Sequence, residues 1–221
     1  MVALNFIYEY GPLLMRGVVM TIQLWLCCMV ISLCVGLVWG LLRSNALRMA
    51  GISNLLDVIT FVLRGVPFYV QLLIAYFVLP EFLGINLSPF AAALFSLGLC
   101  SASYVSQIVR GGMNAIAQGQ WEACFVLGLT KVQTIRYVMI PHLLRTILPM
   151  LTGELDQLLK TTSIVSAIGV MELTRVGMNI IARDMNPLPV YLAVAVMYLA
   201  ASSVLTIVSG YLERRVRYAV R

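Results

Sequence analysis

A long uncharged stretch near the N-terminus indicates the type of fold: residues 17–42, GVVMTIQLWLCCMVISLCVGLVWGLL. A helix crosses the hydrocarbon core of a bilayer, about 30 Å thick, with roughly 20 apolar residues. Residues 82–109 and 187–212 form two further uncharged stretches of sufficient length. These three stretches predict helices that span a membrane.

The composition of the whole chain agrees with a membrane protein. Of its 221 residues, 61% are hydrophobic and 11% charged, and the mean hydropathy is +0.95, outside the usual range of soluble domains. Two less apolar stretches, one with Arg64 and one with Glu154, Asp156 and Lys160, would complete the set of spans. We therefore predict an all-α integral membrane protein with one transmembrane domain and an external loop at 172–186. Its five transmembrane helices are expected at 17–42, 58–80, 85–109, 147–171 and 187–212.

The distribution of lysine and arginine predicts the orientation, because cationic segments resist translocation across the membrane. Most of them follow the first, third or fifth expected span, which puts the N-terminus outside and the C-terminus in the cytoplasm. The formal charge of +6 is then an orientation signal and a contact with anionic lipid, and no nucleic-acid partner is expected. The cations expected in the cytoplasm are Arg43, Arg48, Arg110, Lys131, Arg136, Arg145, Arg214, Arg215, Arg217 and Arg221, against Arg16, Arg175 and Arg183 outside.

Few residues of the chain could hold a metal ion or catalyse a reaction. His142 is the single histidine and the five cysteines form no CxxC pair, so we expect neither a metal site nor a disulfide. The phosphate-binding pattern Gly-x-x-x-x-Gly-Lys-Ser/Thr does not occur in the sequence. A process driven by ATP would therefore need a separate ATPase chain, and no cofactor is expected on this one. An intramembrane enzyme is the least favoured class.

A polar stretch with an internal glycine separates the third and fourth expected spans: residues 119–141, GQWEACFVLGLTKVQTIRYVMIP. The pattern predicts a two-turn helix at 119–127 with Glu122 in its first turn, where the helix dipole favours negative charge. Gly128 then occupies the place where a left-handed residue ends a helix.

A second short helix is expected at 131–140, directly after this glycine. Thr130 and Gln133 fit a capping box, in which each side chain bonds the backbone N–H of the other residue, and Pro141 would close the unit. The helix pair shows aromatic and aliphatic side chains among charges. This indicates either a docking surface for another protein or an amphipathic helix that lies flat on lipid.

Residues 64–67, Arg-Gly-Val-Pro, interrupt the second expected span. Irregular backbone at membrane depth occurs only where protein or a water-filled cavity covers it. The interruption therefore predicts either a plain proline kink or a break that lines a pore.

Three charges fall within the fourth expected span. Asp156 and Lys160 lie four residues apart on one helix face and can neutralise each other. Glu154 lies about 200° around the helix from Asp156 and has no such partner. Because carboxylates inside a membrane usually face a partner or a water-filled cavity, we expect Glu154 to face a translocation path and to meet an amino acid. The alternative is that the Asp156–Lys160 pair is structural and that Glu154 bonds a neighbouring subunit.

The stretch 119–141 resembles the EAA loop of permease subunits of ATP-binding-cassette importers. Glu-Ala-Cys at 122–124, a glycine six residues after the glutamate and Val-Met-Ile-Pro at 138–141 carry the resemblance. In that family the loop sits in a groove of the nucleotide-binding subunit. The resemblance therefore implies an ATPase-coupling loop at about 111–145, with four central residues: Glu122, Ala123, Gly128 and Pro141.

Two further segments resemble the polar amino acid branch of these importers, the histidine/glutamine permease type. They are residues 63–73, LRGVPFYVQLL, and 158–166, LLKTTSIVS. The resemblance implies the type I importer permease architecture and a multi-pass location in the bacterial inner membrane. It also implies a substrate path, for which the expected residues are Arg64, Gln71, Glu154, Asp156 and Lys160.

The same resemblance implies several partners. We expect a second permease subunit, two ATP-binding subunits that hold ATP and magnesium, an extracytoplasmic solute-binding protein, the lipid bilayer and an amino acid substrate. The additional acid at Asp156 slightly favours a cationic amino acid. The competing hypothesis is a secondary amino acid transporter driven by an ion gradient, with the charges of the fourth span as its ion site. The EAA spacing argues against this hypothesis, because such a carrier needs no contact with an ATPase.

Overall fold

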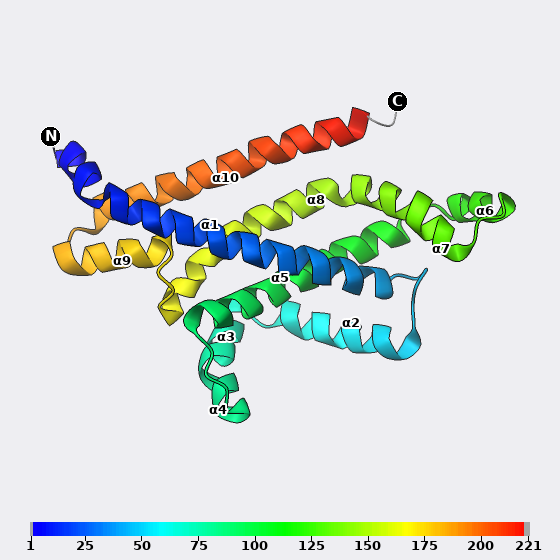
Figure 1. The fold of residues 1–221 in the computed structure, drawn as a ribbon, viewed down its shortest axis with the longest axis horizontal. Coiled ribbons are helices and arrows are strands. Elements are labelled where there is room, and N and C mark those ends of the chain that lie inside the picture. The colour runs from blue at the N-terminus through cyan, green and yellow to red at the C-terminus, as the bar shows by residue number, and fades with distance from the viewer. Residues whose placement is uncertain (1, 219–221) are drawn as a thin grey trace.

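The computed structural model describes residues 2–218, and every regular element within them is helical. Arg221, one of the cations used to predict the orientation, lies outside the described residues. Among the described residues, three helices are long and apolar enough to cross a membrane, or up to five if each of two bent helix pairs counts as one span. Most helices run along one long axis of the molecule (Figure 1). The expected all-α membrane fold is confirmed.

Two long helices form the centre of the bundle, namely α1 (Val2–Leu42) and α5 (Pro89–Asn114). Gly36 and Gly40 of α1 allow the two backbones to approach each other closely. A Cβ atom added to Gly36 or Gly40 would lie only 2.6 or 2.5 Å from a valine side chain of α5. Small residues at helix contacts permit such packing within a membrane, where lipid is as apolar as the side chains.

The first bent pair consists of α2 (Ala50–Gly65) and an arm that follows it. The arm contains α3 (Phe68–Leu73), the π-helical segment η1 (Ile74–Val78) and α4 (Leu79–Leu83). Its axis makes an angle of 104° with α2, so residues 64–67 form a break in the helix and not a plain proline kink. Helix α2 packs along α5, whereas α3 and α4 project away from the bundle (Figure 1).

The second bent pair contains α8 (Ile140–Thr161), the 3-10 segment η3 (Thr162–Ile168) and α9 (Leu173–Asp184), with an angle of 46° between its halves. The expectation of a loop at 172–186 is therefore wrong, because Leu173–Asp184 form a helix. The Glu172 carboxylate caps α9 by accepting hydrogen bonds from two backbone N–H groups of its first turn, at 2.8 and 2.7 Å. The charged residues of α9 lower its hydropathy. A search for apolar stretches therefore does not indicate this helix.

The last helix, α10 (Pro187–Tyr218), packs against α8 and α9. Two polar contacts join it to α8: the Ser202 hydroxyl donates to Asp156, and the Thr152 hydroxyl donates to Glu213 at 3.0 Å. Many of its other side chains are apolar and exposed, as expected of a helix that faces lipid or another subunit.

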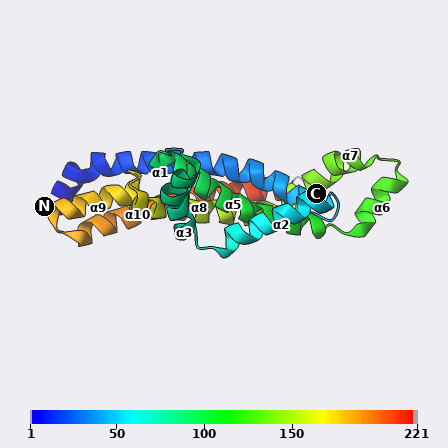
Figure 2. The ribbon, with the colours of Figure 1, turned by 90° about the horizontal axis from the view of Figure 1, so that it is seen from below.

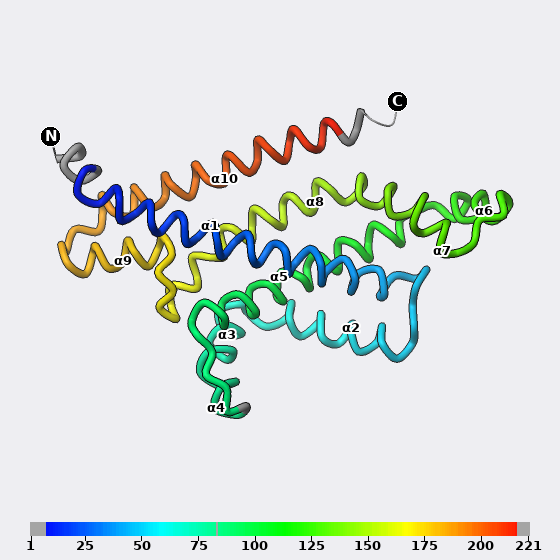
Figure 3. Tube along the Cα trace, viewed as in Figure 1, coloured from blue at the N-terminus to red at the C-terminus, as the bar shows by residue number. Residues whose placement is uncertain are grey.

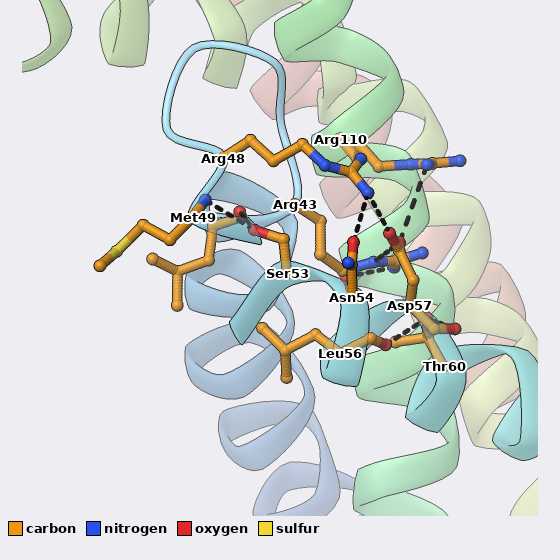
Figure 4. Close-up of polar contacts among 11 residues, drawn as sticks. Arg43, Arg48, Met49, Ser53, Asn54, Leu56, Asp57, Thr60 and Arg110 are labelled. Atoms are coloured by element: carbon orange, nitrogen blue, oxygen red, sulfur yellow. Dashed lines mark hydrogen bonds and ion pairs between the residues drawn. The ribbon is translucent and has the colours of Figure 1, made fainter. Parts of the chain in front are cut away.

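An ion cluster joins the end of α1, the start of α2 and the end of α5 (Figure 4). The Asp57 carboxylate accepts hydrogen bonds from Arg43 at 2.7 Å and Arg48 at 3.1 Å, and the Arg110 guanidinium lies 3.9 Å away. Arg43 is buried and also donates to the Ser106 hydroxyl at 2.9 Å. Because a single carboxylate holds three guanidinium groups, the cluster fixes this end of the bundle.

Helices α6 (Gln118–Val126) and α7 (Lys131–Gln133) lie at the same end as this cluster, and α9 lies at the opposite end (Figures 1 and 2). The trace continues from α7 through the π-helical segment η2 (Thr134–Met139) into α8 without interruption (Figure 3). The expectation that Pro141 closes a separate helix is therefore wrong. Pro141 lies in the first turn of α8, directly after the π-helical segment, and its missing N–H removes one backbone hydrogen bond from this continuous helix.

Candidate functional site

The coupling segment, residues 118–139, contains α6, α7 and η2. Helix α6 begins at Gln118, because Ala117 adopts a non-helical backbone conformation and acts as the N-cap. Glu122 therefore lies in the second turn of α6. The expectation that it lies in the first turn is wrong. The Glu122 and Ala123 side chains are both exposed, so a partner protein could contact them.

Gly128 ends α6 with a left-handed backbone, at φ 74°, as predicted. The Gly128 N–H donates to the Phe125 carbonyl at 3.0 Å, and the Leu129 N–H donates to the Cys124 carbonyl at 3.1 Å. This pair of bonds is the Schellman motif, which satisfies the last carbonyl groups of a helix. A glycine is favoured here because side chains with a Cβ atom rarely adopt this conformation.

The predicted capping box at the start of α7 is also confirmed. The Gln133 N–H donates to the Thr130 hydroxyl at 3.4 Å, and the Thr130 N–H donates to the Gln133 side-chain oxygen at 2.9 Å. Both ends of the turn between α6 and α7 are thus held by hydrogen bonds. The turn therefore sets how α6 is oriented relative to α8.

The coupling segment shows an unusually apolar surface. Phe125, Val126, Leu127 and Val132 are 82, 83, 77 and 73% exposed, although charged neighbours surround them. A cavity of about 820 Å³ lies beside them, with Trp121 and residues of the α1–α2 connection in its wall. Apolar groups that are exposed together usually mark a contact surface for another protein or for a membrane.

A second cavity, the central cavity, has a volume of about 540 Å³ and lies among α2, α3, α5 and α8. Its wall includes Arg64 at the break between α2 and α3, and Glu154 on α8. The break thus lines a cavity, in agreement with the second of the two interpretations of residues 64–67. One cationic and one anionic side chain of the expected substrate path therefore face the same space.

Both charged groups are held by neighbours on α5. The Ser101 hydroxyl donates to Glu154 at 2.7 Å, and it lies 2.9 Å from the Ser32 hydroxyl of α1, which therefore donates to Ser101. The Arg64 guanidinium lies 5.4 Å from the centre of the Tyr104 ring, a distance at which the ring face attracts a cation. The described residues show no ion pair between Arg64 and Glu154, so each could bind a charged group of a ligand.

The other expected substrate-path residues do not line this cavity. Asp156 accepts hydrogen bonds from Lys160 and Ser202, so the expected intrahelical ion pair is present and faces α10. Gln71 donates to two backbone carbonyls near the break between α2 and α3. The structure therefore brings Arg64 and Glu154 to one cavity and leaves Gln71, Asp156 and Lys160 outside its wall.

Three residues of this cavity belong to no motif of the sequence: Ser101, Tyr104 and Gln157. Ser101 belongs to a run of small residues, LGLCSAS at 97–103, whose composition is also typical of helix packing. Only its position opposite Glu154 shows that it contributes to a polar site.

A family model described as "Binding-protein-dependent transport system inner membrane component" matches residues 32–218. The chain is 41% identical over 209 residues to the glutamine transport system permease protein GlnP of Escherichia coli (strain K12), which covers 93% of this chain and 94% of that protein. It is 32% identical over 206 residues to the arginine transport system permease protein ArtQ of Bacillus subtilis (strain 168), with 93% of each chain covered.

Two solved structures have a similar fold. One is described as the crystal structure of an amino acid ABC transporter with histidines, and it matches with a TM-score of 0.86, 33% identity and coverage of 95% of this chain and 96% of that chain. The other, an inward-facing MetNI methionine ABC transporter, matches with a TM-score of 0.81 and 21% identity over 94% of this chain and 98% of that chain. The second match shows the fold alone.

Proposed function

Because this chain belongs to the family of binding-protein-dependent transport system inner membrane components, and is a permease subunit of an amino acid importer of the ATP-binding-cassette class, we propose that its central cavity carries a polar amino acid through the inner membrane. The observation that supports this proposal best is the pair Arg64 and Glu154 in one cavity wall. Free amino acids share one α-carboxylate and one α-amino group, which is protonated at neutral pH. A cavity with one cation and one anion matches these two charges.

The charge balance of the cavity favours a neutral polar amino acid. If Arg64 binds the carboxylate and Glu154 the ammonium group, no charge in the wall is left for a cationic side chain. Gln157 and Thr161 remain in the wall as hydrogen-bonding groups. The slight preference expected for a cationic substrate depended on Asp156. This residue does not line the cavity and contacts α10. Glutamine is the first ligand to test, since the relative at 41% identity is a glutamine permease, and arginine is the second.

The coupling segment is proposed to bind the ATPase. Its apolar residues are exposed at one end of the molecule, beyond the helices that span the membrane (Figure 1). This position favours a docking surface over a helix that lies flat on lipid. The family implies ATP-binding and solute-binding partners in general, and we propose two ATPase chains, a second permease subunit and one external solute-binding protein for this chain.

The proposal is tested on the complex purified from its native membrane and reconstituted in vesicles with the solute-binding protein. Uptake of labelled glutamine is expected to require ATP and to persist when ionophores collapse the ion gradients and the membrane potential. Uptake that follows an ion gradient without ATP would identify a secondary transporter instead.

The substrate site is tested with Glu154→Gln, which keeps the shape and removes the charge. Loss of one charged hydrogen bond is expected to raise KM by roughly tenfold or more. The matched control is Asp156→Asn, two residues further along the same helix and outside the cavity, for which KM should stay close to the wild-type value. Unchanged KM in both variants would show that the ammonium group does not bind at Glu154.

A further inference from the structure

The break between α2 and α3 leaves a backbone carbonyl without its usual donor. In a continuous helix the Leu63 carbonyl would accept a hydrogen bond from residue 67, four positions later. Residue 67 is proline, which has no N–H. The Val66 carbonyl lies in the extended part of the break, where Val66 has φ −91° and ψ 133°. Orphaned carbonyls at membrane depth are costly, because no lipid group can donate to them.

The Gln71 side chain supplies both missing donors. Its amide nitrogen lies 2.8 Å from the Leu63 carbonyl oxygen and 2.7 Å from the Val66 carbonyl oxygen. Both neighbours are acceptors, so the NH2 end of the amide must face them. The Cys100 thiol of α5, 3.8 Å from the Leu63 carbonyl, adds a weaker contact.

The amide of glutamine is suited to making both bonds without a charge. Glutamine offers two N–H donors on one nitrogen, one for each carbonyl. Glutamate in its ionised form offers none, methionine offers none, and asparagine is shorter by one methylene, about 1.5 Å. Gln71 starts the second turn of α3 and bonds the last turn of α2, so its amide spans the bend from one helix to the other.

We propose that Gln71 is a positioning residue that fixes the angle between α2 and α3 and thereby holds Arg64 in the wall of the central cavity. The side chain is not expected to touch the substrate. The inference rests on the proposed function of that cavity as the amino acid site. It also accounts for a glutamine in the expected substrate path that does not line the cavity.

The bend itself is measured by the distance between two spin labels in the assembled complex. One label is placed by Leu55→Cys on α2 and the other by Phe82→Cys at the end of the arm; both side chains are exposed, 61 and 84%. The exposed native Cys27 and Cys34 are changed to alanine in this background. Gln71→Met is expected to broaden and shift the distance distribution, because the two halves are no longer tied together.

The functional consequence is measured as KM and maximal rate of glutamine uptake in vesicles. Gln71→Met and Gln71→Glu are expected to raise KM by about tenfold while the basal rate of ATP hydrolysis stays at the wild-type value, because the coupling segment is untouched. The control is Gln23→Met, at an exposed position of α1, with unchanged KM. Should Gln71→Met fail to assemble, Gln71→Asn replaces it in both measurements with the same outcomes.

The two hypotheses fail in different ways. If the wild-type complex takes up no amino acid, the proposed function is wrong, and the distance measurement alone then decides the structural role of Gln71. If the wild type transports, Glu154→Gln raises KM and the Gln71 variants change neither KM nor the distance distribution, only this inference is overturned.

Discussion

Gly128 connects α6 to α7 in a backbone conformation that other residues adopt only at a cost. Its left-handed φ of 74° closes the Schellman motif, and the capping box begins two residues later. A Cβ atom at this position would meet nothing within 4 Å. The requirement for glycine is therefore conformational and does not come from packing.

We expect Gly128→Val to insert into the membrane normally but to lose the coupling between ATP hydrolysis and uptake. The left-handed conformation costs residues other than glycine about 1–2 kcal/mol, so the turn will rearrange and reorient α6. The measurement is the number of amino acids taken up per ATP hydrolysed in reconstituted vesicles. Gly119→Val is the matched control, because Gly119 lies inside α6 and also has open space around it. An unchanged ratio in Gly128→Val, or an equal loss in the control, contradicts this role.

At the scale of elements, the continuous path from α7 through η2 into α8 connects the coupling segment to Glu154. A movement imposed on the coupling segment can therefore reach the central cavity along one helical path. Such a movement needs a fixed frame to act against. Helices α1 and α5 provide this frame, since their backbones are in close contact at Gly36 and Gly40.

We expect Gly40→Ala to destabilise this frame by roughly 1–3 kcal/mol, the usual cost of overpacking. The added Cβ atom would lie 2.7 Å from the backbone oxygen of Ser106, which no change of rotamer can relieve. The measurement is the thermal unfolding midpoint of the purified protein in detergent. Gly111→Ala on α5 is the control, because nothing lies within 4 Å of its added Cβ; equal midpoints for the two variants would contradict close packing at Gly40.

At the scale of the whole molecule, the segments expected in the cytoplasm gather at one end. This end contains the ion cluster around Asp57 and the coupling segment, whereas α9 and the start of α10 lie at the other end (Figures 1 and 2). The arrangement agrees with the orientation that the cationic residues predict. In that orientation, the end with the coupling segment faces the cytoplasm.

A membrane-impermeant thiol reagent can determine the orientation. In a background without the exposed Cys27 and Cys34, we expect Asn186→Cys, between α9 and α10, to react in intact cells. Gln120→Cys in α6 should react only after the membrane is opened, and both positions are exposed. The reverse pattern would mean that the N-terminus lies in the cytoplasm.

Features that depend on neighbouring residues can be read from the amino-acid order alone. Uncharged stretches indicated the membrane helices, because crossing a bilayer requires a local run of apolar side chains. The glycine, threonine and glutamine of the coupling segment indicated its turn and cap for the same reason: the bonds join residues only a few positions apart. Residues 64–67 likewise indicated an interruption of the helix, but not its angle.

The tertiary structure decided the features that depend on residues far apart in the chain. Only the packing of α5 against α2 and α8 brings Arg64, Ser101 and Glu154 to one cavity. Asp156, on the other side of α8, contacts α10. The buried residue that caps α9, Glu172, accepts a hydrogen bond from Tyr198 of α10 at 2.8 Å. A buried charge becomes acceptable when distant groups bond it, and the order of residues along the chain does not show which groups those will be.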